Sequence, residues 1–495
     1  MFSYIEKPSL AQITNLLFFL FPISFILGSL IVTLNLYLFL ILGFFYIKKS
    51  NYKLNFDYIN NILIFFFLLI IISSLINLQS IKFDYFIRSI LLLRFVFLYM
   101  LMETLLVNKD INFKKFFVVS LVCTSFVSLD IIFQYIFGYN FFGQTEVGGK
   151  LTGVFGDEAV AGGYIQKFSL ISIFGALIFF NEKKYKKFTL CFIILLHLMG
   201  VFFANNKISF ITLFFSLIVL SLIDKETRYI IISSIIIFLS IAFLLLTSEK
   251  NIFNGDDKLK DRYQYTFIKF FLISDGEKND SVIPTIKERL NETEKKTIKE
   301  GQEISKFGKI GKLNIAALNH TRIYITAIES WKKSPLIGRG YKSFRTKCFE
   351  ILEETKGKRK FGLRCATHPH NYQLEILHDF GLVGLFVIFI FSIIKIYLIF
   401  KKFMSKTIKN RIYSIYFVPI VLGLLIEFWP IKSTGSLFTT WNGTATWLLI
   451  ALSVIIKKDI TFDNLNYTKN NTNIFASIFA LILVSTLIIK NVFLA

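Results

Sequence analysis

Three histidines lie close together near residue 370. His368, His370 and His378 fall within eleven residues, although the chain of 495 residues has only five histidines. An imidazole has a pKa near neutrality and can take a proton from an attacking hydroxyl group. A lone histidine is usually structural, so it is the clustering that makes this segment a candidate for general-base catalysis.

Arg322 is the second candidate for chemistry. Residues 315–333 show apolar side chains at helical spacing, which predicts an amphipathic helix. The predicted apolar stripe consists of Tyr324, Ala327, Ile328 and Trp331. Arg322 projects from a different face, together with Thr326 and Glu329. Its planar guanidinium suits bidentate binding of a phosphate, and the alternative is a surface ion pair with Glu329.

Turn-forming residues follow this helix. Pro335 is expected to end it, and Gly338 and Gly340 allow turn conformations that other residues resist. Further on, Asn371 is a plausible N-cap for a short helix over about 372–379. His370 is therefore expected at the start of a helix, where the loop meets the next apolar run.

The rest of the chain is dominated by long apolar segments. Hydrophobic residues make up 54% of the sequence, with 59 Phe, and charged residues only 18%. Apolar runs recur that are long enough to cross about 30 Å of hydrocarbon as helices. A membrane β-barrel would show alternating segments of about ten residues, whereas runs such as Ile62–Ile76 are continuous. The sequence predicts an all-α polytopic membrane protein.

Twelve apolar runs are predicted to be transmembrane helices, or thirteen if the last one also crosses. They cover about 10–28, 30–47, 61–77, 85–107, 116–137, 161–181, 188–204, 208–223, 229–247, 376–400, 412–429 and 440–456, with 474–490 as the thirteenth. The first run has no basic segment before it and no small-residue cleavage site after it. We therefore expect a retained span and not a removed signal peptide.

The short loops differ strongly in charge. Loops assigned to one side carry nineteen Lys and Arg, and those on the other side carry four. The positive-inside rule then places the N-terminus in the cytoplasm and the long loop over 248–371 outside. Because the charges lie between apolar runs, the formal charge of +23 indicates membrane orientation and not nucleic-acid binding.

This topology predicts three regions. An N-terminal transmembrane bundle covers 1–247, an extracytoplasmic loop region with the amphipathic helix and the catalytic segment covers 248–375, and the C-terminal transmembrane helices cover 376–495. The first half of the loop has few apolar clusters and is expected to be solvated surface. Cys348 and Cys365 would lie in an oxidising compartment, either as a disulfide or as two free thiols.

The loop motifs resemble the shared C-terminal region of bacterial O-antigen ligases and polymerases. Arg322, Trp331 and the run Pro335-Leu-Ile-Gly338-Arg-Gly340 carry the first part of this resemblance. The second part is His370-Asn371 followed after nine residues by Gly381-x-x-Gly384, which resembles the ligase signature. The resemblance covers about 314–390. Elsewhere it rests on about twelve spans and a large external loop.

The resemblance implies a metal-independent glycosyltransferase without a cofactor, in the bacterial inner membrane. Its donor would be a glycan linked to undecaprenyl diphosphate, and its acceptor a sugar hydroxyl, usually on lipid A–core. Carried onto this sequence, His370 is the candidate base and Arg322 a candidate diphosphate ligand. Lys207 stands where the ligases have a further arginine. Asn371 and Arg339, within the same motifs, are further candidates for substrate binding.

Three alternatives remain open. The fifteen residues between Arg322 and Gly338 match a spacing of the polymerases, but no second copy of it is found in an earlier loop. A zinc enzyme would need ligands such as Cys365 with the three histidines, whose spacing matches no known ligand motif. A transporter would be expected to show internal repeats and broken spans. The ligase interpretation is favoured over all three.

Overall fold

The computed structural model describes residues 9–180, 184–248, 253–255, 259–260, 263, 319–355, 363–405, 411–430 and 432–457. Within these ranges the regular elements are helices, so the predicted all-α class is confirmed for this part of the chain. The predicted solvated surface before residue 314 and the thirteenth run at 474–490 lie outside these ranges.

Each of the twelve predicted spans coincides with one helix or with two consecutive helices. The bounds are α1 Leu10–Phe19, α2 Phe21–Ile26, α3 Ser29–Lys49, α4 Tyr58–Ile76, α5 Phe83–Leu91, α6 Leu93–Val107, α7 Phe113–Phe137, α8 Ala161–Phe179, α9 Lys186–Phe203, α10 Lys207–Ile223, α11 Arg228–Thr247, α17 Tyr372–Met404, α18 Arg411–Glu427, α19 Thr440–Leu452 and α20 Val454–Lys457. Three runs that were predicted as single spans are pairs: α1 with α2, α5 with α6, and α19 with α20. A short 3-10 helix, η1 (Gly153–Phe155), precedes α8.

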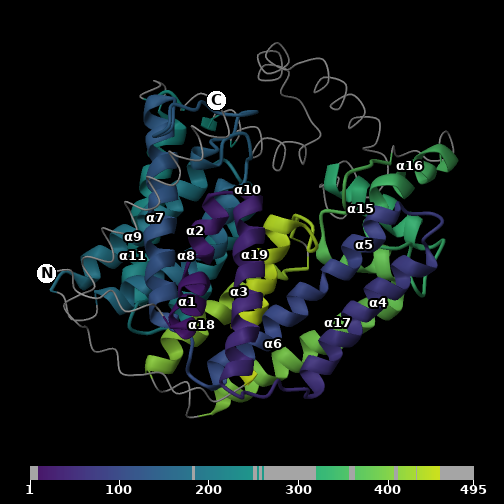
Figure 1. Ribbon diagram of the computed structural model, residues 1–495. Coiled ribbons are helices and arrows are strands. Elements are labelled where there is room, and N and C mark those ends of the chain that lie inside the picture. The colour runs from purple at the N-terminus through teal and green to yellow at the C-terminus, as the bar shows by residue number, and fades with distance from the viewer. Residues whose placement is uncertain are drawn as a thin grey trace, which may run out of the picture.

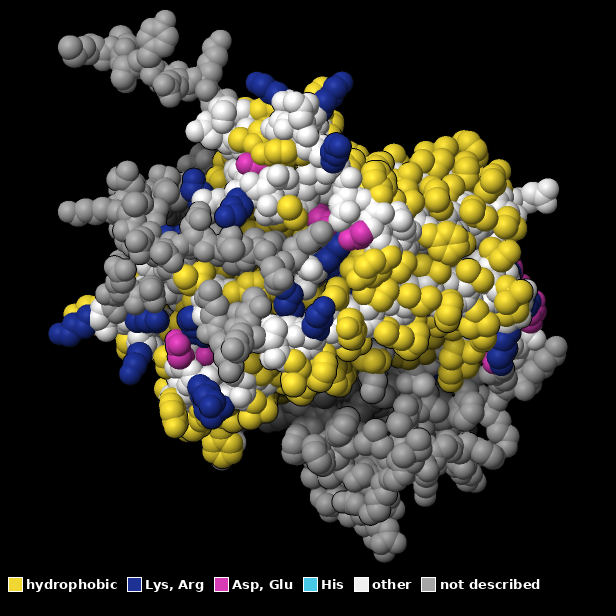
Figure 2. Space-filling view, turned by 90° about the horizontal axis from the view of Figure 1, so that it is seen from below, with side chains coloured by type: hydrophobic (Ala, Val, Ile, Leu, Met, Phe, Trp, Pro, Cys, Tyr) yellow, Lys and Arg dark blue, Asp and Glu magenta, His cyan; other side chains and the backbone are white. Residues whose placement is uncertain are grey.

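Several of these helices have the length and composition of membrane spans. Within the described ranges, eight stretches are long and apolar enough to cross a bilayer, and α1 and α10 are shorter apolar helices. Large apolar side chains are exposed on them, including Phe65 on α4 and Phe389 on α17. Figure 2 shows one broad, continuous apolar face on the molecule. Such a face marks contact with lipid or another apolar partner, and the number of twelve spans stays a prediction.

Loops that were assigned to the same side contact one another. Arg411, before α18, forms an ion pair of 3.0 Å with Asp224, after α10. The Asn205 side chain, after α9, donates a hydrogen bond of 3.1 Å to the carbonyl of Gly149, in the loop before α8. Both contacts agree with the predicted grouping of loops. Which group faces the cytoplasm stays a prediction from the charges.

The long loop contributes two described helices that lie beside α4, α5 and α17 (Figure 1). They are α15 (Asn319–Trp331), which the sequence predicted as part of 315–333, and α16 (Phe344–Thr355), which was not predicted. Both pack against α17 as well as against each other. The spacing of Phe344, Cys348 and Ile351, all buried, could have indicated α16.

The apolar stripe predicted for α15 is wrong by about one position. The buried side chains are Ile323, Thr326, Ala327 and Ser330, whereas Tyr324, Ile328 and Trp331 are only partly buried. Two of the four are hydroxyl side chains, which hydropathy alone places outside. They can be buried because each one is hydrogen-bonded, as described below.

Candidate active site

His370 stands immediately before α17 in an unusual backbone conformation. Asn371 caps α17 as predicted, since its side-chain oxygen accepts a hydrogen bond of 3.0 Å from the Leu374 amide. His370 has a φ of 56°, a region that non-glycine residues seldom occupy and that is frequent at functional sites. The Thr434 amide donates a hydrogen bond of 2.8 Å to the His370 carbonyl. The segment before α19 thus holds the histidine in place.

Three imidazoles gather at this point, and one of them was not expected. The ring centroids of His370 and His368 are 4.1 Å apart, and those of His370 and His320 are 5.2 Å apart. His320 comes from the first turn of α15, fifty residues earlier in the chain. Its membership in the cluster depends on how α15 packs, so no local sequence pattern indicated it.

The surroundings of this cluster favour the neutral form of its imidazoles. Burial lowers the pKa of His370, and the nearby His320 and Arg364 lower it further. Burial and Arg364 also lower the pKa of His320. Burial and His370 lower the pKa of His368 to about 4. Because a general base must be unprotonated before it acts, this arrangement suits proton acceptance at neutral pH.

His378, the third histidine of the sequence cluster, belongs to a separate buried network. Its Nδ1 lies 2.7 Å from the Asp379 carboxylate, and its Nε2 lies 2.9 Å from the Ser330 hydroxyl. Arg339 donates to the same hydroxyl at 3.0 Å and pairs with Glu350 at 2.8 Å. These bonds join α15, α16 and α17, so His378 and Arg339 hold the loop helices on the bundle.

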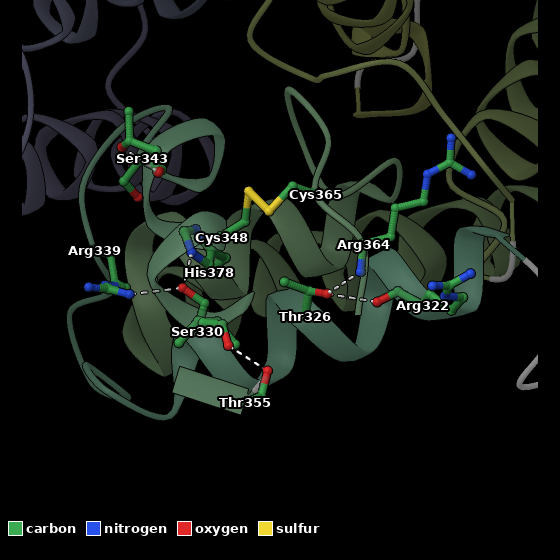
Figure 3. Close-up of a disulfide and its surroundings, with 12 residues drawn as sticks. Arg322, Thr326, Ser330, Arg339, Ser343, Cys348, Thr355, Arg364, Cys365 and His378 are labelled. Atoms are coloured by element: carbon green, nitrogen blue, oxygen red, sulfur yellow. Dashed lines mark hydrogen bonds between the residues drawn. A yellow bond between two sulfur atoms is a disulfide. The ribbon is translucent and has the colours of Figure 1, made fainter. Parts of the chain in front are cut away.

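Arg322 and a second arginine, Arg364, both bond through their backbones to the Thr326 hydroxyl (Figure 3). The Thr326 hydroxyl donates to the Arg322 carbonyl at 2.8 Å and accepts from the Arg364 amide at 3.2 Å. At about 100° per residue, Arg322 starts from the side of α15 opposite to His320 and Tyr324. Arg364 is the arginine whose charge acts on His320 and His370. No local sequence pattern indicated Arg364.

Asn371 directly follows His370 in the chain, whereas Lys207 begins a helix of the bundle. The Asn371 side-chain amide also donates to the Pro430 carbonyl at 2.7 Å, so both ends of this side chain have partners within the protein. Lys207 is the first residue of α10, directly after its N-cap Asn206. A Cβ added at Gly162 of α8 would stand 2.7 Å from the Cβ of Asn206. Lys207 thus begins α10 close to the start of α8.

The backbone segments around the glycines of the two motifs are hydrogen-bonded to each other. Arg339 and Gly340 donate amide hydrogen bonds to the carbonyls of His378 and Asp379, at 3.0 and 2.9 Å. Gly381, with a φ of 69°, interrupts the helical conformation of α17 there, close to where the sequence predicted a helix end. A Cβ on it would stand 2.2 Å from the Leu336 carbonyl oxygen. Only glycine allows the two segments to approach this closely.

A disulfide joins Cys348 of α16 to Cys365, with Cα atoms 5.5 Å apart (Figure 3). Of the two states that the sequence left open, the structure has the bridge. It ties the segment that leads into His368 and His370 to α16. It also removes Cys365 from the zinc ligands considered above. Among the described residues, no group of three or more His, Cys, Asp or Glu side chains is placed to hold a metal ion.

A pocket of about 130 Å³ opens beside His368. It lies between the loop after Gly340, the first turns of α17 and the segment before α19. Its polar lining residues are Lys342, Arg345, Thr367, His368, Glu375, Asp379, Ser436 and Thr439. The pocket therefore combines cations, acids and hydroxyl groups next to the histidine cluster.

These features define an all-helical protein with membrane-type helices and a histidine site at the loop–bundle boundary. Residues 190–389 match the family model described as O-antigen ligase, in agreement with the resemblance of the loop motifs. The matched stretch includes Lys207, Arg322, Arg339, His370 and Asn371. No curated protein matches the chain. The family implies a glycosyltransferase-type enzyme that acts on lipid-linked glycans.

Proposed function

We propose that the protein transfers a glycan from undecaprenyl diphosphate to a sugar hydroxyl at the outer face of the bacterial inner membrane. The family match supports the reaction type. The observation that carries the assignment of the site is the imidazole cluster around His370, which lies next to α17 and has lowered pKa values. Lipid A–core is the proposed acceptor.

In the proposed reaction His370 is the general base. The acceptor oxygen bonds to the anomeric carbon of the donor while the bond from that carbon to the diphosphate oxygen breaks. The hydroxyl proton passes to His370, and undecaprenyl diphosphate leaves with its negative charge. A lowered pKa supports this role, because it keeps the imidazole unprotonated before the attack.

Cations are needed where negative charge develops on the leaving diphosphate. Arg322, which the family motif indicates, and Lys207 are proposed diphosphate ligands. We add Arg364, because its charge acts on His370 and its amide is linked to α15 through Thr326. Guanidinium groups stabilise phosphate oxygens without a metal ion.

Asn371 and Arg339 are proposed to act on the site indirectly. Asn371 caps α17 and bonds to Pro430, so its amide fixes the position of the neighbouring His370. Arg339 bonds to Ser330 and Glu350 and so fixes α15 to α16. Both are positioning residues in this proposal, and neither needs to touch the substrate.

The test is a transfer assay with the purified full-length chain in lipid vesicles. A labelled glycan on undecaprenyl diphosphate is supplied with lipid A–core, and both the free diphosphate lipid and the labelled acceptor are measured. We expect equal amounts of the two products. Labelled glycan that grows while it stays on the diphosphate lipid would indicate a polymerase instead. No donor consumption by wild-type protein would overturn the proposal.

A further inference from the structure

The pocket beside His368 contains two cations, Lys342 and Arg345, whose side chains form no hydrogen bond or ion pair among the described residues. The Nε of Arg345 is buried and has no hydrogen-bond partner in that part of the chain. Its guanidinium carbon lies 5.5 Å from the centre of the Tyr85 ring of α5. The ammonium of Lys342 lies over an aromatic face, with Nζ 5.1 Å from the centre of the Tyr341 ring.

The acidic residues of the pocket do not neutralise these cations directly, because they are engaged elsewhere. Glu375 accepts hydrogen bonds from the Ser436 hydroxyl and, at 2.8 Å, from the Leu437 amide. Asp379 accepts from the backbone amide of Lys342 at 2.9 Å and lies 2.7 Å from Nδ1 of His378. Both carboxylates thus hold backbone and side chains of the protein.

Further positive charge surrounds Lys342. Burial lowers its pKa to about 8, and Arg345, Arg88 and Arg94 lower it further, against the opposite effect of Glu375. Arg88 of α5 pairs with the exposed Asp84, whereas Arg94 begins α6 and reaches Tyr37 at 3.4 Å. Like charges gathered at a partly buried place repel one another unless an anion binds between them.

The pocket is large enough for a small group. A single water needs about 10–15 Å³ on the same measure, so a cavity of about 130 Å³ has room for a phosphate group. Ser436 and Thr439 add hydroxyl groups to the lining. Guanidinium, ammonium and hydroxyl donors around such a volume match a phosphate group.

We propose that the pocket between Lys342 and Arg345 binds a phosphate group carried by one of the two glycolipid substrates. This inference rests on the proposed glycan transfer for the identity of the carrier. His368 lines the pocket, and the centre of its ring lies 4.1 Å from that of His370. A phosphate seated there would therefore place its sugar beside the proposed base.

Binding can be tested without enzyme activity. The purified chain is treated at pH 8 with an amine-reactive reagent, and modification of Lys342 is followed by mass spectrometry. Sodium diphosphate and glucose 1-phosphate are the probes, because a bound anion would cover the amine and raise its pKa. We expect each of them to slow modification of Lys342 several-fold, and we expect Arg345→Gln to abolish this protection. Equal rates with and without the probes in the wild type would overturn the proposal.

Kinetics then identify the carrier. In the transfer assay, Arg345→Gln should raise the KM for one substrate about 10- to 100-fold, the usual effect of losing a charge-assisted hydrogen bond to phosphate. A higher KM for the donor alone assigns the pocket to the donor diphosphate. A higher KM for the acceptor alone assigns it to an acceptor phosphate. Unchanged KM values for both would overturn the proposal.

Lys333→Gln is the matched control, because Lys333 is an exposed cation of the same region that pairs with Glu354 outside the pocket. It should leave both KM values and the protection of Lys342 unchanged. The protection experiment also separates this inference from the proposed function. Protection without any transfer by the wild type would contradict the proposed function and leave the phosphate site in place.

Discussion

At the scale of single residues, the pKa of the base His370 depends on residues from other parts of the chain as well as on burial. Its ring contacts His320 and His368, and Arg364 adds a positive charge nearby. Burial, His320 and Arg364 each make protonation of His370 less favourable. The result is a base that stays active below the usual pKa of histidine.

This gives a prediction about pH dependence. Activity should fall as the pH drops through the lowered pKa of His370, because the protonated ring cannot accept the hydroxyl proton. Arg364→Gln removes a cation that lowers this pKa, so the pKa rises and the acidic limb of the kcat/KM profile should move to higher pH. A profile of the variant that overlays that of the wild type would contradict the assigned effect of Arg364.

The sequence supplied the most important site residue but not its surroundings. His370, Asn371 and the paired glycines follow from motif spacing and capping rules, because these are local signals. His320 and Arg364 join the site through packing of α15 and through the disulfide-linked segment, which no local pattern encodes. His378 shows the reverse, since it is close to His370 in sequence but is bonded to Ser330 and Asp379 in a buried network.

At the scale of elements, the interruption of α17 at Gly381 is the main structural device. A helix interruption frees backbone groups that must find other partners. Here the segment over 335–340 supplies them, with Leu382 donating to the Pro335 carbonyl at 2.8 Å. Ser73 of α4 donates to the Asp379 carbonyl at 2.9 Å and so fixes the same place to the bundle.

Gly381→Ala should therefore be strongly destabilising. The new Cβ would stand 2.2 Å from the Leu336 carbonyl oxygen, and the φ of 69° is unfavourable for alanine. We expect a loss of about 2–4 kcal/mol in unfolding free energy, measured by denaturation in detergent. Gly163→Ala on α8 is the control, since a Cβ there meets nothing within 4 Å. Equal stability of the two variants would contradict the paired-glycine account.

The disulfide between Cys348 and Cys365 should stabilise the same region. For a sequence separation of 17, chain-entropy arguments give about 3 kcal/mol. Cys365→Ser should accordingly lower transfer activity and the stability of the loop helices. A thiol count in denatured protein checks the bridge: we expect Cys123 and Cys191 to react without reductant, and all four cysteines after reduction. Four reactive thiols before reduction would show that the bridge is absent.

At the scale of the whole molecule, the helix positions were predictable and their orientation remains a prediction. Long apolar runs are a strong signal, and each predicted span in the described ranges coincides with a helix or a helix pair. The breaks after α1, α5 and α19 were missed, because hydropathy does not respond to a local change in backbone direction. The helix α16 was missed for a different reason: it lies in a charged loop, where its few apolar side chains were overlooked.

The charge difference between loops predicts which end of the molecule faces outward. Lys48 lies in the last turn of α3, at an end assigned to the cytoplasm, and Ser80 lies in a loop assigned to the outside; both side chains are exposed. A membrane-impermeant maleimide should label Ser80→Cys in whole cells and Lys48→Cys only in opened cells. The opposite pattern would invert the topology and place the histidine cluster in the cytoplasm, where lipid-linked glycan transfer at the outer face is excluded.

The central claim is that His370 accepts the proton of the acceptor hydroxyl. The most direct measurement is the kcat of His370→Gln for glycan transfer from undecaprenyl diphosphate, compared with wild-type protein of equal abundance and thermal stability. Loss of a general base predicts a fall in kcat of at least about 100-fold with little change in the KM of the donor. A kcat within about threefold of the wild type would contradict the role of His370.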